Sequence, residues 1–157
     1  MRMRINGYGL LLLFPGLFSA ALAADISVVG NWSEFIDSND LASGAGSDLR
    51  SPIESDTALA TLDITATGGA SWTVKASKSD INWPAGVSLA VKRTSDGTGT
   101  GTISGGATYL TLTGAEQTLF TGSGDRGSIQ LQLRTEFLSV TTEAPDIYST
   151  NVIYLIQ

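Results

Sequence analysis

The sequence of 157 residues contains neither cysteine nor histidine. The lack of cysteine excludes disulfide bonds, on which small exported domains often depend, so packing and strand pairing must hold this chain together. The lack of histidine removes the commonest general base and the commonest transition-metal ligand. The usual activating partners of a nucleophilic serine are therefore missing, and a thiol nucleophile is excluded.

Other signatures of catalysis are also missing. The sequence has no G-x-S-x-G and no S-x-x-K pattern, and its Asp and Glu residues fall mainly in turns or at the polar positions of expected strands. A calcium-binding loop beginning at Asp37 fails because its fifth and sixth positions are Leu41 and Ala42. We expect no enzyme activity, no cofactor and no metal site; a calcium site assembled from several loops stays open as the alternative to solvated carboxylates.

The first residues have the pattern of a secretory signal peptide. Arg2 and Arg4 precede an apolar stretch, and the small residues Ala21 and Ala23 follow it in the arrangement that signal peptidases accept. The apolar stretch is interrupted by Pro15 and is too short for a membrane span, which needs about 20 residues. We expect residues 1–23 to be a signal peptide, cleaved after Ala23, and residues 24–157 to form one domain that is secreted, periplasmic or at a bacterial cell surface.

The charge of the mature chain is strongly acidic. Cleavage after Ala23 leaves seven basic and fifteen acidic residues, a net charge of −8. Binding to phosphate groups needs clustered Lys and Arg, and Lys92 and Arg93 are the only adjacent basic pair in this part of the chain. We therefore expect neither nucleic acid nor an anionic membrane as a partner, and no membrane span after cleavage.

Apolar residues alternate with polar ones along most of the chain, which is typical of β-strands with one buried face. Abundant Gly, Thr and Ser and a low charged fraction agree with an all-β protein. The alternation is clearest in residues 57–67, 71–77, 86–93, 127–137 and 145–157. In the last of these, Val152, Tyr154 and Ile156 share one face while Ile153 and Leu155 lie on the other, so this strand is expected to be buried on both sides.

Turn signals rich in Gly separate these strands, at residues 68–69, 84–86, 95–101, 104–106 and 122–127. Strands with this spacing predict an immunoglobulin-like sandwich of two antiparallel sheets, with a small β-barrel as the alternative. The polar, Gly-rich residues 37–52 predict a long exposed loop between the first strand and the rest of the domain.

The segment that follows the expected cleavage site is a short alternating strand. Ile26, Val28, Gly30 and Trp32 are spaced by two residues. Such a strand can pair within its own domain, or it can be donated to the edge of a neighbouring subunit, where main-chain hydrogen bonds provide affinity. These four residues are the candidates for strand exchange.

The three tryptophans are candidates for either packing or binding. Trp72 lies on an alternating strand and is expected in the core. Trp32, after the first strand, and Trp83, before a proline in a turn, are candidate contacts for a sugar ligand, with packing over the edge of the sandwich as the alternative.

The sequence resembles pilin-like and spore-coat-U-like β-sandwich subunits, which are exported bacterial proteins. The shared features are a signal peptide followed at once by a short strand, a Gly- and Thr-rich body, and an ending of the form P-x-x-Y-S-x-x-V-x-Y, here Pro145, Tyr148, Ser149, Val152 and Tyr154. The resemblance implies that the last strand is a central structural element. It also implies homo-oligomers or other surface-assembly subunits as partners, and a periplasmic chaperone. Tyr148 would act as a corner tyrosine whose hydroxyl bonds to nearby backbone.

Three hypotheses for the function follow from these features. The first is a structural or adhesive subunit of a bacterial surface assembly, polymerising by exchange of its N-terminal strand. The second is a monomeric extracellular module that binds carbohydrate through Trp32 and Trp83. The third is a protein-binding module that uses the loops at residues 37–52 and 95–106.

Overall fold

The protein is described by a computed structural model that covers residues 2–9 and 24–157. It is an all-β sandwich, which confirms the predicted fold class. A single short 3-10 helix, Ser38–Asp40, accompanies the strands in these residues. The strands are β1 (Arg2–Gly9), β2 (Asp25–Val29), β3 (Asn31–Phe35), β4 (Ile53–Glu54), β5 (Ala60–Thr65), β6 (Ser71–Asn82), β7 (Ser88–Arg93), β8 (Thr98–Gly99), β9 (Ile103–Ser104), β10 (Leu110–Thr111), β11 (Gln117–Ser123), β12 (Arg126–Glu136) and β13 (Ile147–Ile156).

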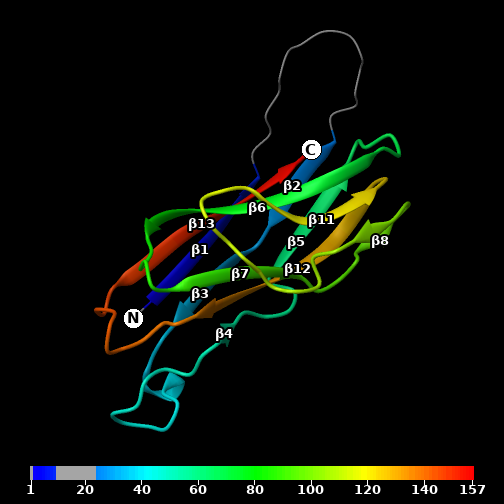
Figure 1. Ribbon diagram of the computed structural model, residues 1–157. Helices are drawn as coiled ribbons and strands as arrows, with labels where there is room; N and C mark the ends of the chain where they lie inside the picture. Colours follow the sequence, from blue (N-terminus) through cyan, green and yellow to red (C-terminus); the bar gives the residue numbers. More distant parts are fainter. Residues whose placement is uncertain (1, 10–23) are drawn as a thin grey trace.

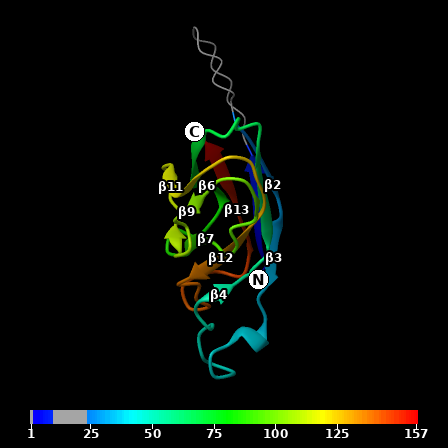
Figure 2. The same cartoon turned by 90° about the vertical axis from the view of Figure 1, so that its right-hand side faces the viewer.

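Two sheets form the layers of the sandwich (Figures 1 and 2). In the first sheet the strand order is β3-β1-β13-β6-β11-β9, and in the second it is β10-β7-β12-β5-β2, with β4 and β8 also pairing to β12. Neighbouring strands are antiparallel throughout, except that β1 runs parallel to β13. The strand that comes first in the chain thus lies beside the strand that comes last.

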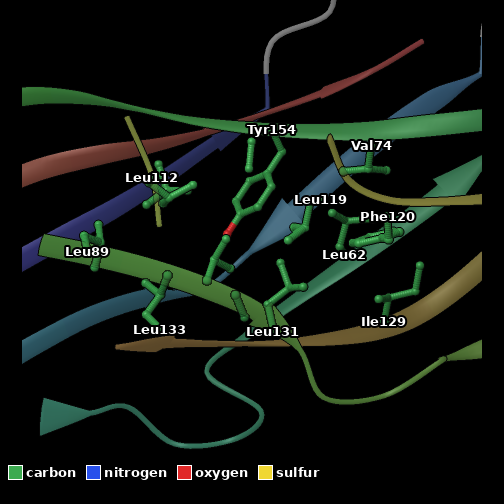
Figure 3. Close-up of a cluster of buried hydrophobic side chains, with 14 of the residues drawn as sticks. Leu62, Val74, Leu89, Leu112, Leu119, Phe120, Ile129, Leu131, Leu133 and Tyr154 are labelled. Atoms are coloured by element: carbon green, nitrogen blue, oxygen red, sulfur yellow. The ribbon is translucent and has the colours of Figure 1, made fainter. Parts of the chain in front are cut away.

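The core lies between the two sheets and is built from the alternating residues of the long strands (Figure 3). Leu62 and Ile64 of β5 face Val74 of β6 and Val152 of β13 across it, and all four are almost completely buried. Trp72 is also in the core, as expected, with its ring edge-on to Phe120 and its Nε1 donating to the carbonyl oxygen of Gly124 at 2.8 Å. Burial of these apolar side chains is the main term that stabilises the domain.

The last strand, β13, confirms the predicted alternation. Val152 and Tyr154 are buried between the sheets, while Ile153 and Leu155 on the other face are partly exposed rather than buried. The hydroxyl of Tyr148 donates to the carbonyl oxygen of Ala144, so the expected bond to nearby backbone is present.

The segment of residues 37–52 projects from one end of the sandwich and is coloured cyan at the bottom of Figures 1 and 2. The Asp37 side chain caps the short 3-10 helix by accepting from the backbone N–H of Asn39 at 2.7 Å. The segment is not only a polar loop, because Leu41 and Leu49 pair with each other and Leu49 is buried. Leu49 belongs to a second, smaller apolar cluster with Ile36, Val87 and Leu138.

Candidate functional site

The most unusual feature of the fold is the position of β1, which we call the β1 slot: the space in the first sheet between β3 and β13. Residues 2–9 fill this slot, running parallel to β13 from Ile147 to Tyr154 and antiparallel to β3. They belong to the expected signal peptide, and the rest of that segment lies outside the described residues. The strand formed by residues 2–9 therefore completes the first sheet of the sandwich, between β3 and β13 (Figure 1).

The floor of the β1 slot is apolar. Trp32, Val152 and Tyr154 contribute to it from the two flanking strands, and Ala60 and Leu133 contribute from the opposite sheet. With β1 in place, a cavity of only about 10 Å³ remains between these side chains. Burial raises the pKa of the Tyr154 hydroxyl, which therefore stays neutral beneath the slot.

The two strands that form the walls of the β1 slot, β3 and β13, depend on β1 for their pairing to different degrees. Within the described residues, β1 is the only strand that pairs with β3, whereas β13 also pairs with β6. Without a strand in the slot, β3 would lose its ladder, and β13 would expose one row of main-chain donors and acceptors. Such unpaired rows are a template for pairing with another strand.

The predicted exchange segment forms β2 and β3, which lie in different sheets. Ile26 and Val28 lie on β2, which pairs with β5 along its whole length, and both pack partly buried against the core. Gly30 marks the change of sheet, with a φ of +147°. Trp32 then enters the core from β3. In this structure the segment is therefore paired inside its own domain.

The two candidate sugar contacts are engaged in packing. Trp32 is only 5% exposed, and its Nε1 donates to the carboxylate of Glu34 at 3.1 Å. Trp83 packs partly buried against both apolar clusters, and its Nε1 donates to the carbonyl oxygen of Val87 at 2.7 Å. Trp32 is thus covered by its own domain, whereas Trp83 keeps part of its surface exposed.

A shallow groove at the far end of the first sheet is lined by hydroxyl groups. Its volume is about 430 Å³. Thr73, Thr121 and Ser104 stand side by side on three adjacent strands along this groove. The groove could not be predicted from the sequence, because Ser and Thr at the polar positions of strands give no signal that separates a binding surface from an ordinary solvated face.

A second pocket, of about 270 Å³, lies beside the projecting segment. Its apolar walls are formed by Ile36, Leu41, Leu49 and Val140. The acidic residues Asp37 and Glu143 also line the pocket. The pocket includes part of the loop at residues 37–52 that was a candidate protein-binding loop. The other candidate loop, residues 95–106, accepts hydrogen bonds from two arginines that lie on neighbouring strands. Arg126 donates to the carbonyl oxygen of Gly101 at 2.6 Å, and Arg93 donates to the carbonyl oxygen of Gly105.

On the outer face of the second sheet, Tyr109 lies between two cations. Lys92 Nζ is 4.4 Å and Arg134 Cζ is 4.0 Å from the centre of its ring. Burial, reinforced by the neighbouring Glu54, raises the pKa of Tyr109 to about 12. The phenol is therefore neutral at physiological pH, and the stack is held by cation–π attraction.

No protein-family model matches the chain, and no curated protein matches it. Across residues 2–9 and 24–157, no three acidic side chains gather in a way that would hold a metal ion. The same residues contain no helix that is long and apolar enough to cross a membrane.

Proposed function

We propose that the protein is an exported, non-enzymatic structural or adhesive subunit of a bacterial surface assembly, in which a strand supplied by another chain occupies the β1 slot. The observation that carries this proposal is the pairing of residues 2–9 with both β3 and β13. These residues precede the expected cleavage site, so the mature chain would keep the slot and lose the strand that fills it.

The chemistry of the slot supports this role. Its floor is apolar, and its two walls present main-chain groups that need a partner in a sheet. An incoming strand would satisfy those groups on both sides and cover Trp32 and Val152 from water. Strand addition of this kind provides affinity through the main chain, so it suits repeated assembly of subunits.

The proposal is tested by purifying the processed protein from its own cells and determining its N-terminus and mass distribution. We expect Ala24 as the first residue, and complexes that survive native electrophoresis but dissociate when the protein is unfolded. A second preparation retains residues 2–9 through a blocked cleavage site and serves as the control. It should be monomeric, because its slot is filled from within. A processed chain that is a stable monomer would contradict the proposal.

A monomeric carbohydrate-binding module is the second candidate. The hydroxyl-lined groove favours it more than Trp32 or Trp83 do, because Ser and Thr hydroxyls can exchange hydrogen bonds with a sugar. Replacement of Thr73 and Thr121 by Val would abolish retention on a polysaccharide matrix if this groove were the site. The same replacement would leave assembly into complexes unchanged.

A further inference from the structure

We infer that the pocket beside the projecting segment, which we call the end pocket, binds a peptide segment of a different protein in which a large apolar side chain lies next to a Lys or Arg. The end pocket is lined by residues 36–49 on one side and by the loop before β13, residues 137–146, on the other. It shares no lining residue with the β1 slot. The inference is therefore independent of the proposed function.

Hydrogen bonds hold the two walls of the end pocket together. Asp48, in the projecting segment, accepts from the Ser139 hydroxyl at 2.6 Å and from the backbone N–H of Val140 at 3.0 Å, both in the opposite loop. The bond from Ser139, reinforced by backbone N–H groups, lowers the pKa of Asp48, so the carboxylate is ionised at neutral pH. Leu49 anchors the same wall in the second apolar cluster. The pocket is thus formed before a ligand binds, which reduces the entropy lost on binding.

The size and the walls of the end pocket favour one large side chain over a whole small molecule. Its volume is about 270 Å³, whereas sites for drug-sized ligands usually enclose roughly 300–1,000 Å³. Most of the lining side chains are apolar, and Val140 is 48% exposed. A side chain of the size of leucine or phenylalanine would cover this surface and remove apolar area from water.

The charge at the end pocket favours a cation beside that apolar side chain. Asp37 and Glu143 line the pocket, and the ionised Asp48 joins its walls. Arg50, the nearby cation, is paired with Asp40 at 3.2 Å. Glu143 is partly buried, and none of the side chains that the structure describes pairs with its carboxylate. A carboxylate in this position is complemented by a Lys or Arg of the ligand.

A second copy of this chain is a poor source of that cation, because all seven basic side chains of residues 24–157 are already engaged. Lys92 stacks on Tyr109, and Arg126 donates to the carbonyl oxygen of Gly101. The remaining five form ion pairs within the chain: Arg50, Lys75, Lys78, Arg93 and Arg134. The partner is therefore a different polypeptide with a free basic residue.

The inference is tested by selecting peptides that bind the full chain from a random heptapeptide library displayed on phage. We expect the selected peptides to share a large apolar residue within two positions of a Lys or Arg. The selection is repeated on a Val140→Ser chain, whose change lies on an exposed part of the wall. This variant should no longer enrich these peptides. A selection without this pattern, or with the same pattern on both chains, would overturn the inference.

One selected peptide, carrying a fluorophore, is then titrated with variants of the chain, and its fluorescence anisotropy reports binding. Glu143→Gln keeps the size of the side chain and removes its charge, so it should weaken binding by about tenfold. Asp25→Asn is the matched control. It removes an equal charge at the start of β2, where Asp25 pairs with Thr65, and it should leave the affinity unchanged. Equal melting temperatures of the variants show that the fold is retained.

Three further results would overturn the inference. Equal affinities of the Glu143→Gln variant and the original chain would show that charge does not select the ligand. Displacement of the peptide by hexylammonium at equal concentration would assign the end pocket to a small amine. Self-association of the full chain in sedimentation, abolished by Val140→Ser, would assign it to a second copy. The proposed function would stand in each case, because none of these measurements concerns the β1 slot.

Discussion

At the scale of single residues, Trp72 shows how closely the core is packed. Its ring lies under β11, where Gly122 pairs with it across the strands. A Cβ at Gly122 would lie 2.3 Å from Cη2 of Trp72 and 2.5 Å from the carbonyl oxygen of Thr102. The missing side chain therefore lets the indole reach the carbonyl oxygen of Gly124, to which its Nε1 donates.

Gly122→Ala should therefore lower the free energy of unfolding by about 2 kcal/mol, because the added methyl group must displace the indole ring or the strand. Equilibrium unfolding in urea, followed by tryptophan fluorescence, measures this loss. Gly114→Ala is the control, since a Cβ there meets nothing within 4 Å. Equal losses from the two substitutions would show that the contact with Trp72 is not what excludes a side chain.

Tyr148→Phe removes only the hydroxyl that donates to the carbonyl oxygen of Ala144. We expect the free energy of unfolding to fall by about 1 kcal/mol, the usual net value of one hydrogen bond. The urea midpoint should fall with an unchanged slope. An unchanged midpoint would mean that the bond does not stabilise the turn before β13.

At the scale of elements, the change of sheet between β2 and β3 is the feature on which the β1 slot depends. β2 belongs to one sheet and β3 to the other, and Gly30 joins them with a φ of +147°. This backbone conformation and the approach of Leu59 leave no room for a side chain.

Gly30→Ala should lower the free energy of unfolding by about 3 kcal/mol, because the backbone strain and the steric clash add together. Gly44→Ala is the matched control: its φ is +87°, but a Cβ there would lie in open space. The control should lose about 1 kcal/mol from the unfavourable φ alone. Urea unfolding of both variants checks the difference, and similar losses would contradict the role of the Leu59 contact.

Strands with one clean alternating face could be predicted from the sequence, as β5, β12 and β13 show. β11 could not, because it carries a bulge between Thr118 and Phe120, so that Leu119 and Phe120 are buried in succession and the period of two is lost. The slot itself could not be predicted either. Residues 2–9 have the composition of a leader, and their pairing with residues 147–154 is set by the assembled sheets rather than by any local pattern.

At the scale of the whole molecule, three aspartates that accept hydrogen bonds make stability depend on pH. Hydrogen bonds lower the pKa of three aspartates: Asp48 accepts from the Ser139 hydroxyl, Asp125 from Thr67, and Asp146 from the backbone N–H of Ile147. A carboxylate whose pKa is lower in the folded state stabilises that state above its ordinary pKa, here 3.8. This contribution is lost as the pH falls through the lowered values.

We therefore expect the melting temperature to be nearly constant between about pH 5 and 7 and to fall steeply below about pH 4. Thermal unfolding followed by circular dichroism across this range measures the change. Asp125→Asn keeps the shape of the side chain but cannot titrate, so its melting temperature should fall less between pH 5 and pH 3 than that of the original chain. An identical fall in both proteins would assign the acid sensitivity to other groups.

Because β1 pairs with β13, the β1 slot can form only after residues 147–156 have been synthesised. Among the described strands β13 is made after all the others, and it forms one whole wall of the β1 slot. A chain interrupted before Ile147 would lack this wall and would also lack Val152 and Tyr154 in the floor, so it would offer a partner strand only the β3 side of the slot. If another chain supplies a strand to the slot, as we propose, that strand would engage only chains that have been made at least as far as Ile156, so assembly would select molecules whose translation has passed this point.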